Sequence, residues 1–529
     1  NCGGEGLYYS RRIGRTPELA GYYGETGLLE PVTILGAAKL MGRMPGGMTI
    51  GVLDAVTRHT ANPGDTTFSP ATNFALVRAT QDFRGGNSTV GAMLTAVNRN
   101  LDRWSSPYLS SAAYAVAMDF RHRLFGNNYE ISGSLDRSHV RGSSDAIHAL
   151  QINGVHLYQR PDADLPLDPA RTTLNGDAEE IKFGKVGGQN LLFQTALQRR
   201  SPGFEINDLG FLRRADQVTW STWVGVFDRR ATKYYNRLQL NNNWWQSWTT
   251  DGLPLERAYN TNFHITFLNN WGWHMGGTVG QLGTTYDDRA ARGGPAVRQD
   301  PFIAPWFFIN GDDRKAVVPF FNVNYFRGSG GRSERWSYGP ELSFKLSGRF
   351  SSNLAMNWER NISANQWYGN FTSDDATHYT FARLDQRTTS ITARLNYTFT
   401  PNVSLQTYLQ PFVSRGSYSD VRALSATPRA EDYDDRYVPY ADAEVTADPG
   451  KELYFICAVH AEMRVRLGFG PSGEAAQERR AIEEETGVRI RDERVTVAAV
   501  TAFCPWCSFA AHGDSVEMAY VRLDAHAAG

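Results

Sequence analysis

Strict alternation of apolar and polar side chains is the feature that most constrains how this chain can fold. In residues 388–399, TTSITARLNYTF, apolar or small residues fall at every second position, and Thr, Arg and Asn lie between them. The side chains of a β-strand point to opposite faces in turn, so this segment predicts a strand with one apolar and one polar face. Leu395 and Tyr397 lie on the apolar face, and Arg394 and Asn396 on the polar one.

The same period recurs between Val32 and Val413, in about 18 to 20 strand-like segments. An amphipathic helix would repeat every 3.6 residues instead. Many two-faced strands predict an all-β fold, namely a large antiparallel up-and-down transmembrane β-barrel whose apolar face meets lipid. Clear examples are residues 114–120, 262–267, 319–325, 342–346 and 353–359.

Composition narrows the alternatives. The chain has 529 residues, and no stretch approaches the roughly 18 to 20 apolar residues that a membrane-spanning helix needs. Barrel strands carry only half of that apolar signal, so a barrel remains open. Aromatic residues make up 12% of the chain, which suits barrel girdles and large soluble sheets alike. The formal net charge of −1 gives no reason to expect nucleic acid as a partner.

The connections between segments carry a second signal. Tight turns are expected at residues 269–270, 311–312, 347–348 and 401–402, and longer polar loops at residues 283–300, 327–333, 361–377 and 415–437. If residues 379–399 form one strand, the two kinds of connection alternate. Membrane barrels have short turns at one end and long loops at the other, whereas a Greek-key sandwich is not expected to alternate in this way.

The polar faces supply the candidate binding residues. They are rich in Asn, Gln, Arg and Thr, and in a barrel they would line a wet lumen; in a soluble sheet they would be solvated strand faces. The N-terminal arginines fit either a plug or mouth segment or a basic surface loop. The candidates are Asn322, Asn324, Arg394, Asn396, Gln406 and Gln410, with Arg11, Arg12 and Arg15 of the N-terminal segment.

Signals for catalysis are weak. The 11 histidines are scattered without a His-Glu-x-x-His pair, and the chain has neither a Gly-x-Ser-x-Gly elbow nor a phosphate loop. We therefore expect neither a cofactor nor an assembled catalytic site. Acidic loops around Asp162, Asp164 and Asp434 offer the oxygen atoms that calcium binds, or simply solvated charge. They are also where a surface hydrolase would place its site, and a soluble all-β binding module is a further alternative.

The last part of the chain differs in composition. Residues 451–529 contain three of the four cysteines, a helix-like segment at residues 478–490 and the pair Cys504 and Cys507, spaced as in redox and zinc sites. This pattern indicates either a small α/β-like or disordered appended segment or a frame-shifted or misjoined sequence. We divide the chain into an N-terminal plug or lead-in (residues 1–31), an outer-membrane barrel (residues 32–450) and an atypical tail (residues 451–529).

Several ordered segments carry a family resemblance. They are LYYSRRIGR (residues 7–15), ILGAAKLMGRMPGG (34–47) followed by IGVLDAVT (50–57), YQRPDAD (158–164), RSPGFEINDLGFLRRAD (200–216) and LNYTFTPNVSLQTYLQPFVSRGSYSD (395–420). Together they resemble a bacterial family of unknown function. Its members look like large outer-membrane barrels that follow a family 9 carbohydrate-binding module, and the resemblance covers residues 3–450.

The resemblance implies an outer-membrane location in a bacterial cell, with outer-membrane lipid as a partner. It also implies surface binding or passage of a glycan or another solute through a polar lumen, and it brings no catalytic residue. The chain departs from the family because the carbohydrate-binding module is absent and residues 451–529 do not match. It begins at Asn1 without an apolar leader, which we interpret as a cleaved leader or a fragment.

Overall fold

The computed structural model describes residues 6–24, 30–188, 190–373, 375–400 and 403–441, with the backbone of three short strands further on. Those strands are β25 (Glu452–Ile456), β26 (His460–Gly468) and β27 (Arg494–Val497). The turn expected at residues 401–402, the helix expected at residues 478–490 and the Cys504/Cys507 pair lie outside the described residues.

Antiparallel pairing organises the chain. Within the described residues all strands except four short ones form one 23-stranded sheet, and each long strand from β1 to β21 pairs with the next long strand along the chain. This confirms the all-β, up-and-down antiparallel fold that the alternation predicts. The strands are β1 (Ile34–Arg43), β2 (Met48–Thr57), β5 (Thr72–Phe83), β6 (Ser88–Arg99), β7 (Ala112–Leu124), β8 (Tyr129–Arg141), β9 (Thr173–Lys185), β10 (Leu191–Arg200), β11 (Gln217–Asp228), β12 (Tyr235–Trp248), β13 (Pro254–Phe267), β14 (Gly272–Gly280), β17 (Phe302–Asn310), β18 (Val317–Gly328), β19 (Ser333–Ser347), β20 (Phe350–Ser373), β21 (Ala376–Thr400), β22 (Val403–Gln410), β23 (Phe412–Leu424) and β24 (Tyr437–Pro439).

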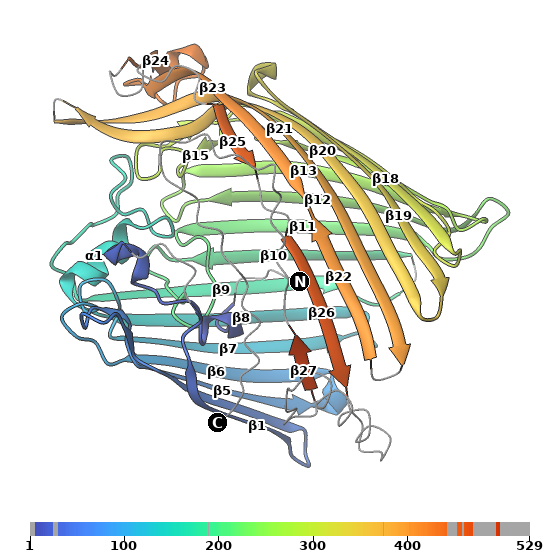
Figure 1. Ribbon diagram of the computed structural model, residues 1–529, viewed down its shortest axis with the longest axis horizontal. Coiled ribbons are helices and arrows are strands. Elements are labelled where there is room, and N and C mark those ends of the chain that lie inside the picture. The colour runs from blue at the N-terminus through green and yellow to red at the C-terminus, as the bar shows by residue number, and fades with distance from the viewer. Residues whose placement is uncertain are drawn as a thin grey trace, which may run out of the picture.

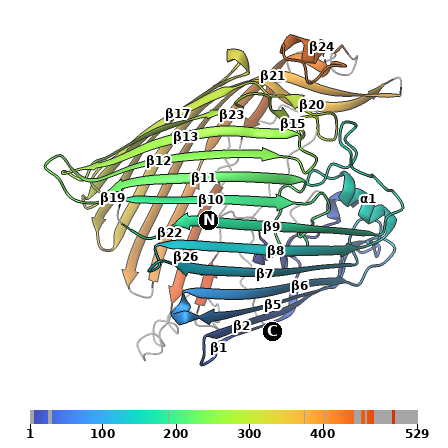
Figure 2. The ribbon, with the colours of Figure 1, turned by 180° about the vertical axis from the view of Figure 1, so that it is seen from behind.

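The sheet curls round on itself (Figures 1 and 2). In Figure 1, strands β5–β13 form the rear wall, and β18–β22 with β26 cross in front of them. Within the described residues, β1 pairs with β2 alone, and β27 pairs with β26 alone. The two margins of the curled sheet are therefore its first strand and its last strands.

Short and long connections lie at opposite ends of the strands. At the turn end, tight connections include residues 44–47, 84–87, 125–128, 268–271 and 348–349. At the loop end, the longer connections are residues 58–71, 100–111, 142–172, 201–216, 281–301 and 425–436. They contain the short strands β3 (Thr60–Ala61), β4 (Thr67–Ser69), β15 (Tyr286–Asp287) and β16 (Val297–Arg298).

Several predicted turns are confirmed, and three predicted loops are wrong or too long. The turns at residues 269–270, 311–312 and 347–348 are present, but residues 361–373 continue β20, which pairs with β21 as far as Ser373 and Ala376. Similarly, β23 extends to Leu424, and residues 327–333 reduce to the single turn η4 (Ser329–Gly331). Polar residues do not end a strand when the neighbouring strand forms hydrogen bonds with its backbone groups. Composition alone therefore overestimated the lengths of these loops.

Proline divides one long strand in two. β22 pairs with the turn-end half of β21, and β23 pairs with its loop-end half. Pro411 stands between β22 and β23 and has no backbone N–H to give to the ladder, yet its carbonyl oxygen accepts a hydrogen bond from Ile391 N at 3.0 Å. The sheet therefore continues past the interruption.

One α-helix, α1 (Ser144–Ile152), follows β8 at the loop end. Ser143 caps it by accepting a hydrogen bond from Ala146 N at 3.2 Å. The sequence analysis missed this helix because it is short and lies within a long polar connection. No helix in the described ranges is long and apolar enough to cross a membrane.

Candidate functional site

Packed clusters at the loop end show which side of the sheet is the inside. Phe74 of β5, Val97 of β6 and Val140 of β8 pack with Ile147 of α1 and Leu209 of the connection 201–216. Residues opposite each other in an antiparallel pair share a face, so the register extends this assignment to the other strands. We call side chains on this face inward and the others outward.

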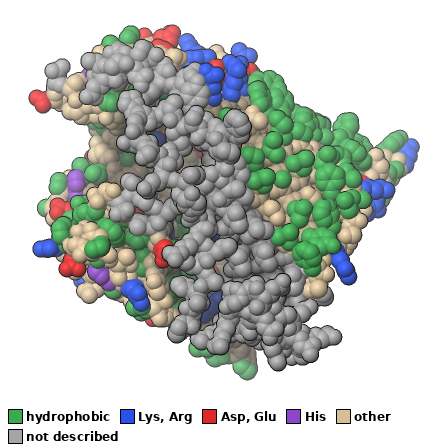
Figure 3. Space-filling model, in the orientation of Figure 1, with side chains coloured by type: hydrophobic (Ala, Val, Ile, Leu, Met, Phe, Trp, Pro, Cys, Tyr) green, Lys and Arg blue, Asp and Glu red, His purple; other side chains and the backbone are tan. Residues whose placement is uncertain are grey.

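The outward face carries an exposed apolar band between two sets of aromatic rings. Leu342, Leu354, Met356 and Ile391 in the band are each at least 40% exposed, and Figure 3 shows the apolar surface on the right of the molecule. Aromatic residues flank this band towards both ends of the strands. The turn-end set is Tyr129, Phe183, Phe193, Phe267, Trp273, Phe350, Tyr397 and Phe399, and the loop-end set is Trp244, Tyr259, Tyr325, Trp336, Tyr338 and Trp358.

The distance between the two aromatic sets is close to the length of a membrane-spanning β-strand, which is about 9–11 residues. Phe350 and Trp358 lie at the two edges of the band on β20, about eight residues apart and so roughly 26 Å along the strand. Polar outward residues within the band and at its edge bond to one another: Thr195 Oγ1 lies 2.9 Å from Thr222 Oγ1, and Tyr259 Oη donates to Asn242 Oδ1 at 2.5 Å. Such mutual pairing is what a low-dielectric environment requires.

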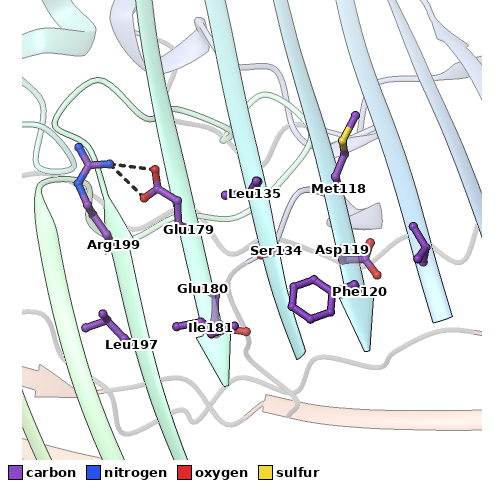
Figure 4. Close-up of a pocket in the computed structure, with 11 residues that line it drawn as sticks. Met118, Asp119, Phe120, Ser134, Leu135, Glu179, Glu180, Ile181, Leu197 and Arg199 are labelled. Carbon is purple, nitrogen blue, oxygen red and sulfur yellow. Dashed lines mark hydrogen bonds and ion pairs between the residues drawn. The ribbon is translucent and has the colours of Figure 1, made fainter. Parts of the chain in front are cut away.

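A groove of about 560 Å³ crosses the outward face of β7–β10 (Figure 4). Met118, Leu135, Ile181 and Leu197 line it, and the ion pair of Arg199 with Glu179, at 3.0 Å, lies beside it. The groove belongs to the apolar outer surface, so it does not mark the lumen.

The inward face of β5–β10, which we call the charged wall, is rich in ionisable side chains. Arg78 Nη2 donates to Asp119 Oδ1 at 2.9 Å, and Arg123 Nε lies 3.0 Å from Glu130 Oε2. Close pairing of opposite charges keeps most of this wall neutral overall. The ionisable residues are Arg78, Asp82, Arg99, Asp119, Arg121, Arg123, Glu130, Asp136, Glu180, Lys182 and Arg200.

An inner pocket of about 340 Å³ lies between the charged wall and the connection 201–216. Asp136, Glu180 and Lys182 line its wall side, while Phe204 and Ile206 of the connection cover it. Lys182 and Gln198 both contact Glu180, whereas no cation pairs with Asp136 among the described side chains. The pocket therefore combines charged and apolar surfaces.

The inward face of β11–β14, β17 and β18, which we call the amide–aromatic wall, has a different chemistry. Its formally charged residues are Arg237 near the turn end and Glu256 near the loop end. Neighbouring strands place its polar and aromatic members in rows across the sheet. They are Trp223, Phe227, Gln239, Asn241, Asn243, Trp245, Asn260, Asn262, His264, His274, Phe302, Trp306, Phe308, Asn310, Phe320, Asn322, Asn324 and Phe326.

Hydrogen bonds join the amides of this wall into a ladder. Asn241 Nδ2 donates to Asn262 Oδ1 at 2.7 Å, and Asn262 Nδ2 donates to Asn260 Oδ1 at 2.8 Å. Asn260 Nδ2 in turn donates to Gly277 O and Thr278 Oγ1, both at 3.0 Å. The anchor on a backbone carbonyl fixes the direction of the amides, because an oxygen could not replace Nδ2 there.

Aromatic rings continue the ladder towards β18. His264 and His274 lie with their Nδ1 atoms 2.8 Å apart, and the His274 ring stacks on that of Phe308 at 4.2 Å between centroids. Trp306 lies beside Phe308 with the two rings only 16° from parallel. A Cβ on Gly276 would lie 2.8 Å from Trp306, so the glycine makes room for this ring.

Connections from the loop end fold over the charged wall. Phe204 and Leu212 of the connection 201–216 pack on the inward residues Ala115 and Ala178. A Cβ on Gly176 of β9 would lie 2.1 Å from Phe204 N, so only glycine permits this contact of backbone on strand.

A buried contact between a histidine and a carboxylate secures the same connection. His156 Nε2 lies 2.9 Å from Glu205 Oε2, and both side chains are almost fully buried. Nearby, Arg99 donates to Asp208 Oδ1 and to Ser110 Oγ. Burial alone would raise the pKa of Asp208, but Arg99 and the Ser110 hydroxyl hold it below its ordinary value.

A group of ion pairs, which we call the mouth latch, joins four connections. Asp288 accepts two hydrogen bonds from Arg214 at 2.8 Å and one from Arg160 at 3.2 Å, and its side chain is only 4% exposed. Arg429 Nη2 donates to Asp162 Oδ2 at 2.5 Å. The latch thus ties together residues 142–172, 281–301 and 425–436 across the loop end, and includes Arg214 of the connection 201–216.

The pKa of Asp162 reflects its place in the latch. Burial by itself would raise this pKa, but the Ala296 N–H and the guanidinium groups of Arg429 and Arg160 outweigh burial and lower it. Asp162 thus keeps its charge to lower pH than an ordinary aspartate.

The predicted arginines of the N-terminal segment lie at the loop end. Arg12 donates to Gly210 O and Asn207 Oδ1 at 2.9 Å, and Arg15 pairs with Glu18. Burial, with the like charges of Arg99 and Arg12, lowers the pKa of Arg15 to about 10. Arg11 is exposed. The segment therefore packs on the connection 201–216, and its role as a plug stays a prediction.

The other lumen candidates fall into two groups. Asn322 and Asn324 belong to the amide–aromatic wall, while Arg394 and Asn396 share an inward face with Gln406 and Gln410 of β22. The Arg394 guanidinium lies 5.0 Å from the centre of the Tyr408 ring. The register thus brings each group together but keeps the two apart on the curled sheet.

The acidic candidates do not assemble into a metal site. Asp162 is engaged by Arg160 and Arg429, Asp434 contacts Arg332 at 3.4 Å, and Asp164 is exposed. Within the described residues no group of three or more His, Cys, Asp or Glu side chains could hold a metal ion. Arginines engage Asp162 and Asp434, so calcium binding at these residues stays a prediction.

Sequence reasoning missed the latch and the ladder. Arg160 and Asp288 are 128 positions apart, so no local pattern could have paired them. The ladder left a clearer signal: NNN at residues 241–243 and the alternating Asn260, Asn262 and His264 put several amides and a histidine on one face. Counting inward residues strand by strand would have separated this neutral stretch from the charged one before it.

Comparisons with known proteins agree with the family resemblance. Residues 4–445 match the family described as Domain of unknown function (DUF5916), and no curated protein matches. That description names no carbohydrate-binding module, so the link to such a module stays a prediction.

Several solved structures are similar in fold. They include the FrpB iron transporter from Neisseria meningitidis (TM-score 0.41, 8% identity, covering 83% of this chain and 72% of that chain) and the siderophore receptor PirA from Acinetobacter baumannii (0.38, 8%, 81% and 75%). A third is the outer membrane protein opdK from Pseudomonas aeruginosa (0.31, 12%, 70% and 93%). Because these TM-scores are below 0.5, we base no functional argument on them.

Proposed function

We propose that this chain, which belongs to the family described as Domain of unknown function (DUF5916), is an outer-membrane β-barrel of a bacterial cell that binds or passes a solute through a polar lumen. A glycan is one class of solute that this role would accommodate. The N-terminal segment and the mouth latch would control access from the loop end.

The outward face is the observation that carries this proposal. Its apolar band lies between two sets of aromatic rings, which are separated by nearly the length of a tilted membrane-spanning strand. A soluble sheet of this size would have to cover such a surface, since large exposed apolar patches mark contact with a partner or a membrane. Lipid is the partner that fits a band following the strands round a curled sheet.

The inward face supports the second half of the proposal. Its amides, ion pairs and half-buried rings are typical of a surface that water reaches, and a pocket of about 340 Å³ opens on it. The connections that fold over the charged wall are placed where they would narrow the lumen, because they pack on inward residues of the strands.

Two neighbouring residues on β20 give the sharpest test. Met356 is outward and 43% exposed, while Asn357 is inward. We expect Met356→Arg to destabilise the folded barrel by about 2–4 kcal/mol, as for a cation at the centre of a lipid-facing band, and Asn357→Arg to cost much less. Folding into lipid vesicles, followed by electrophoresis with and without heating, measures the folded fraction in a urea titration.

A heat-dependent shift in mobility for the unmodified chain, with the loss confined to Met356→Arg, is the expected result. Equal tolerance of both arginines, or a chain that stays in solution without detergent, would favour a soluble all-β module and contradict the proposal.

A further inference from the structure

We propose that the amide–aromatic wall is a binding site for an uncharged, hydroxyl-rich ring compound, that is, a saccharide, centred on Trp306, Phe308 and Asn322. The inference rests on the proposed function, since it takes the inward face to be reachable by solute.

The lack of charge is the first argument. The charged residues of this wall, Arg237 and Glu256, lie towards opposite ends of β12 and β13, and the residues between them are amides, aromatic rings, small residues and histidines. On the next strand, the inward Glu341 lies opposite Phe320, where it already accepts a hydrogen bond from Asn353. An ion entering this stretch would lose hydration without meeting a paired countercharge. A neutral solute carries no such cost.

The aromatic rings form the second argument. The His274 ring stacks against one face of the Phe308 ring, and the space above Gly276 receives the ring of Trp306. Phe308 and Trp306 are nearly parallel, with ring centres 5.5 Å apart, and both side chains are half-buried. Together with Phe320, whose ring centre lies 5.7 Å from that of Phe308, they form a half-exposed aromatic patch, against which the C–H face of a sugar can pack.

Asn322 provides the third argument. It is the register partner of Phe308 on the neighbouring strand β18, so its amide lies beside the ring. A Cβ on Gly339 would lie 2.0 Å from Asn322 Oδ1, so the amide extends over that glycine. Among the described residues it makes no hydrogen bond, unlike Asn241, Asn260 and Asn262 of the ladder. It therefore keeps a donor and an acceptor free for a hydroxyl group, which needs both.

The ladder supplies rigidity at this site. Because Asn260 is anchored on Gly277 O, and Asn262 and His264 follow from it, the amides keep their orientation before a ligand arrives. His274 links this ladder to Phe308 on one side and to Asn310 Oδ1, at 2.9 Å, on the other. A site whose groups are already ordered loses less entropy on binding.

Adjacent phenylalanines on β17 allow a matched test. Phe308 is inward, and Phe307 is outward in the apolar band. We would titrate the full chain, folded in a zwitterionic detergent without a sugar head group, with maltohexaose, cellohexaose and tri-galacturonate, and measure binding by calorimetry.

We expect at least one neutral oligosaccharide to bind and tri-galacturonate to bind more weakly. Phe308→Leu should weaken the neutral ligand about three- to tenfold, as for the loss of one aromatic partner. Phe307→Leu should leave the affinity unchanged, and Asn322→Ala should weaken it in the same direction as Phe308→Leu.

Heat-dependent gel mobility shows whether each variant is folded. If a variant is not folded, Trp306→Phe, which keeps an aromatic ring, is titrated in its place. If a folded barrel binds none of the neutral sugars, binds tri-galacturonate more tightly, or is unaffected by Phe308→Leu, the saccharide site is overturned while the barrel stands. If no barrel forms at all, both proposals fall.

Discussion

Two neighbouring stretches of one sheet build their inner surfaces in opposite ways. The charged wall of β5–β10 uses ion pairs such as Arg78 with Asp119, whereas the amide–aromatic wall of β11–β18 uses an amide ladder and stacked rings. Both stretches keep the same outward apolar band and the same antiparallel pairing. The backbone fold therefore does not determine the chemistry of the inner surface. That chemistry depends on the inward side chains, which are every second residue of each strand.

The two walls also differ in what covers them. Connections from the loop end pack on the inward residues of the charged wall, through the clusters around Leu209 and Phe204. No packed cluster of buried residues lies on the ladder within the described part of the chain. The difference indicates that the connections anchor on the charged wall and not on the amide ladder.

The largest expected effect concerns the connections at the loop end and the mouth latch that holds them together. Asp288→Asn would leave the buried guanidinium group of Arg160 and the partly buried one of Arg214 without their shared countercharge. We expect the connections at residues 142–172 and 281–301 to open more easily by about 3 kcal/mol, measured as faster hydrogen exchange there. Asp434→Asn, which removes an exposed partner of Arg332, serves as the control and should change little. Unchanged exchange in Asp288→Asn would show that the latch does not hold the mouth.

The next largest effect on stability is expected when a carboxylate replaces an amide in one wall, compared with the reverse change in the other wall. Asn260→Asp would set a carboxylate oxygen against Gly277 O, 3.0 Å away, and we expect a loss of about 1–3 kcal/mol in urea unfolding. The reverse change in the other wall, Asp136→Asn, removes a charge that no described cation pairs with and that shares its pocket with Glu180. It should be neutral or slightly stabilising. Equal losses in the two variants would mean that the walls are not chemically distinct.

A smaller effect is expected on ion selectivity. Arg121 is inward on the charged wall, where it donates to Gly86 O at 3.2 Å and Thr89 Oγ1 at 3.1 Å. If the barrel conducts in planar bilayers, Arg121→Glu should shift the potassium-to-chloride permeability ratio towards potassium, by about twofold. Asn241→Gln on the other wall should leave the ratio unchanged. A response to the second variant alone would reverse the assignment of the two walls.

The smallest effect is a pH dependence of the latch. Because the pKa of Asp162 is lowered in the folded protein, its pairing with Arg429 stabilises the closed mouth above the ordinary aspartate range and is lost as the pH falls through the lowered pKa. The pair is partly exposed, so we expect about 0.2–1 kcal/mol. The protection of the amides of residues 142–172, that is, their exchange rate relative to the intrinsic rate at each pH, should fall in acid. Asp162→Asn should remove this component and lower the protection at neutral pH. An identical acid profile in both proteins would assign the effect to another group.

Alternation alone predicted the sheet, the outward band and the inward position of Asn322 and Asn324, because strand geometry sends successive side chains to opposite faces. It could not predict which amides meet, since the pairing of Asn241 with Asn262 depends on the register between two strands. The sequence could not predict the latch either, because Arg429 and Asp162 are 267 positions apart. The predicted loop lengths were wrong where polar residues continue a strand, as in β20.

Cysteine scanning along β21 tests the central claim most directly, namely that one face of this sheet meets lipid and the other meets water. Single cysteines at positions 394–397, in a chain whose four native cysteines are replaced by serine, would be labelled in vesicles with a membrane-impermeant thiol reagent and with a lipid-soluble one. The account predicts that Arg394→Cys and Asn396→Cys react with the impermeant reagent, and Leu395→Cys and Tyr397→Cys with the lipid-soluble one. Equal reaction at all four positions would contradict it.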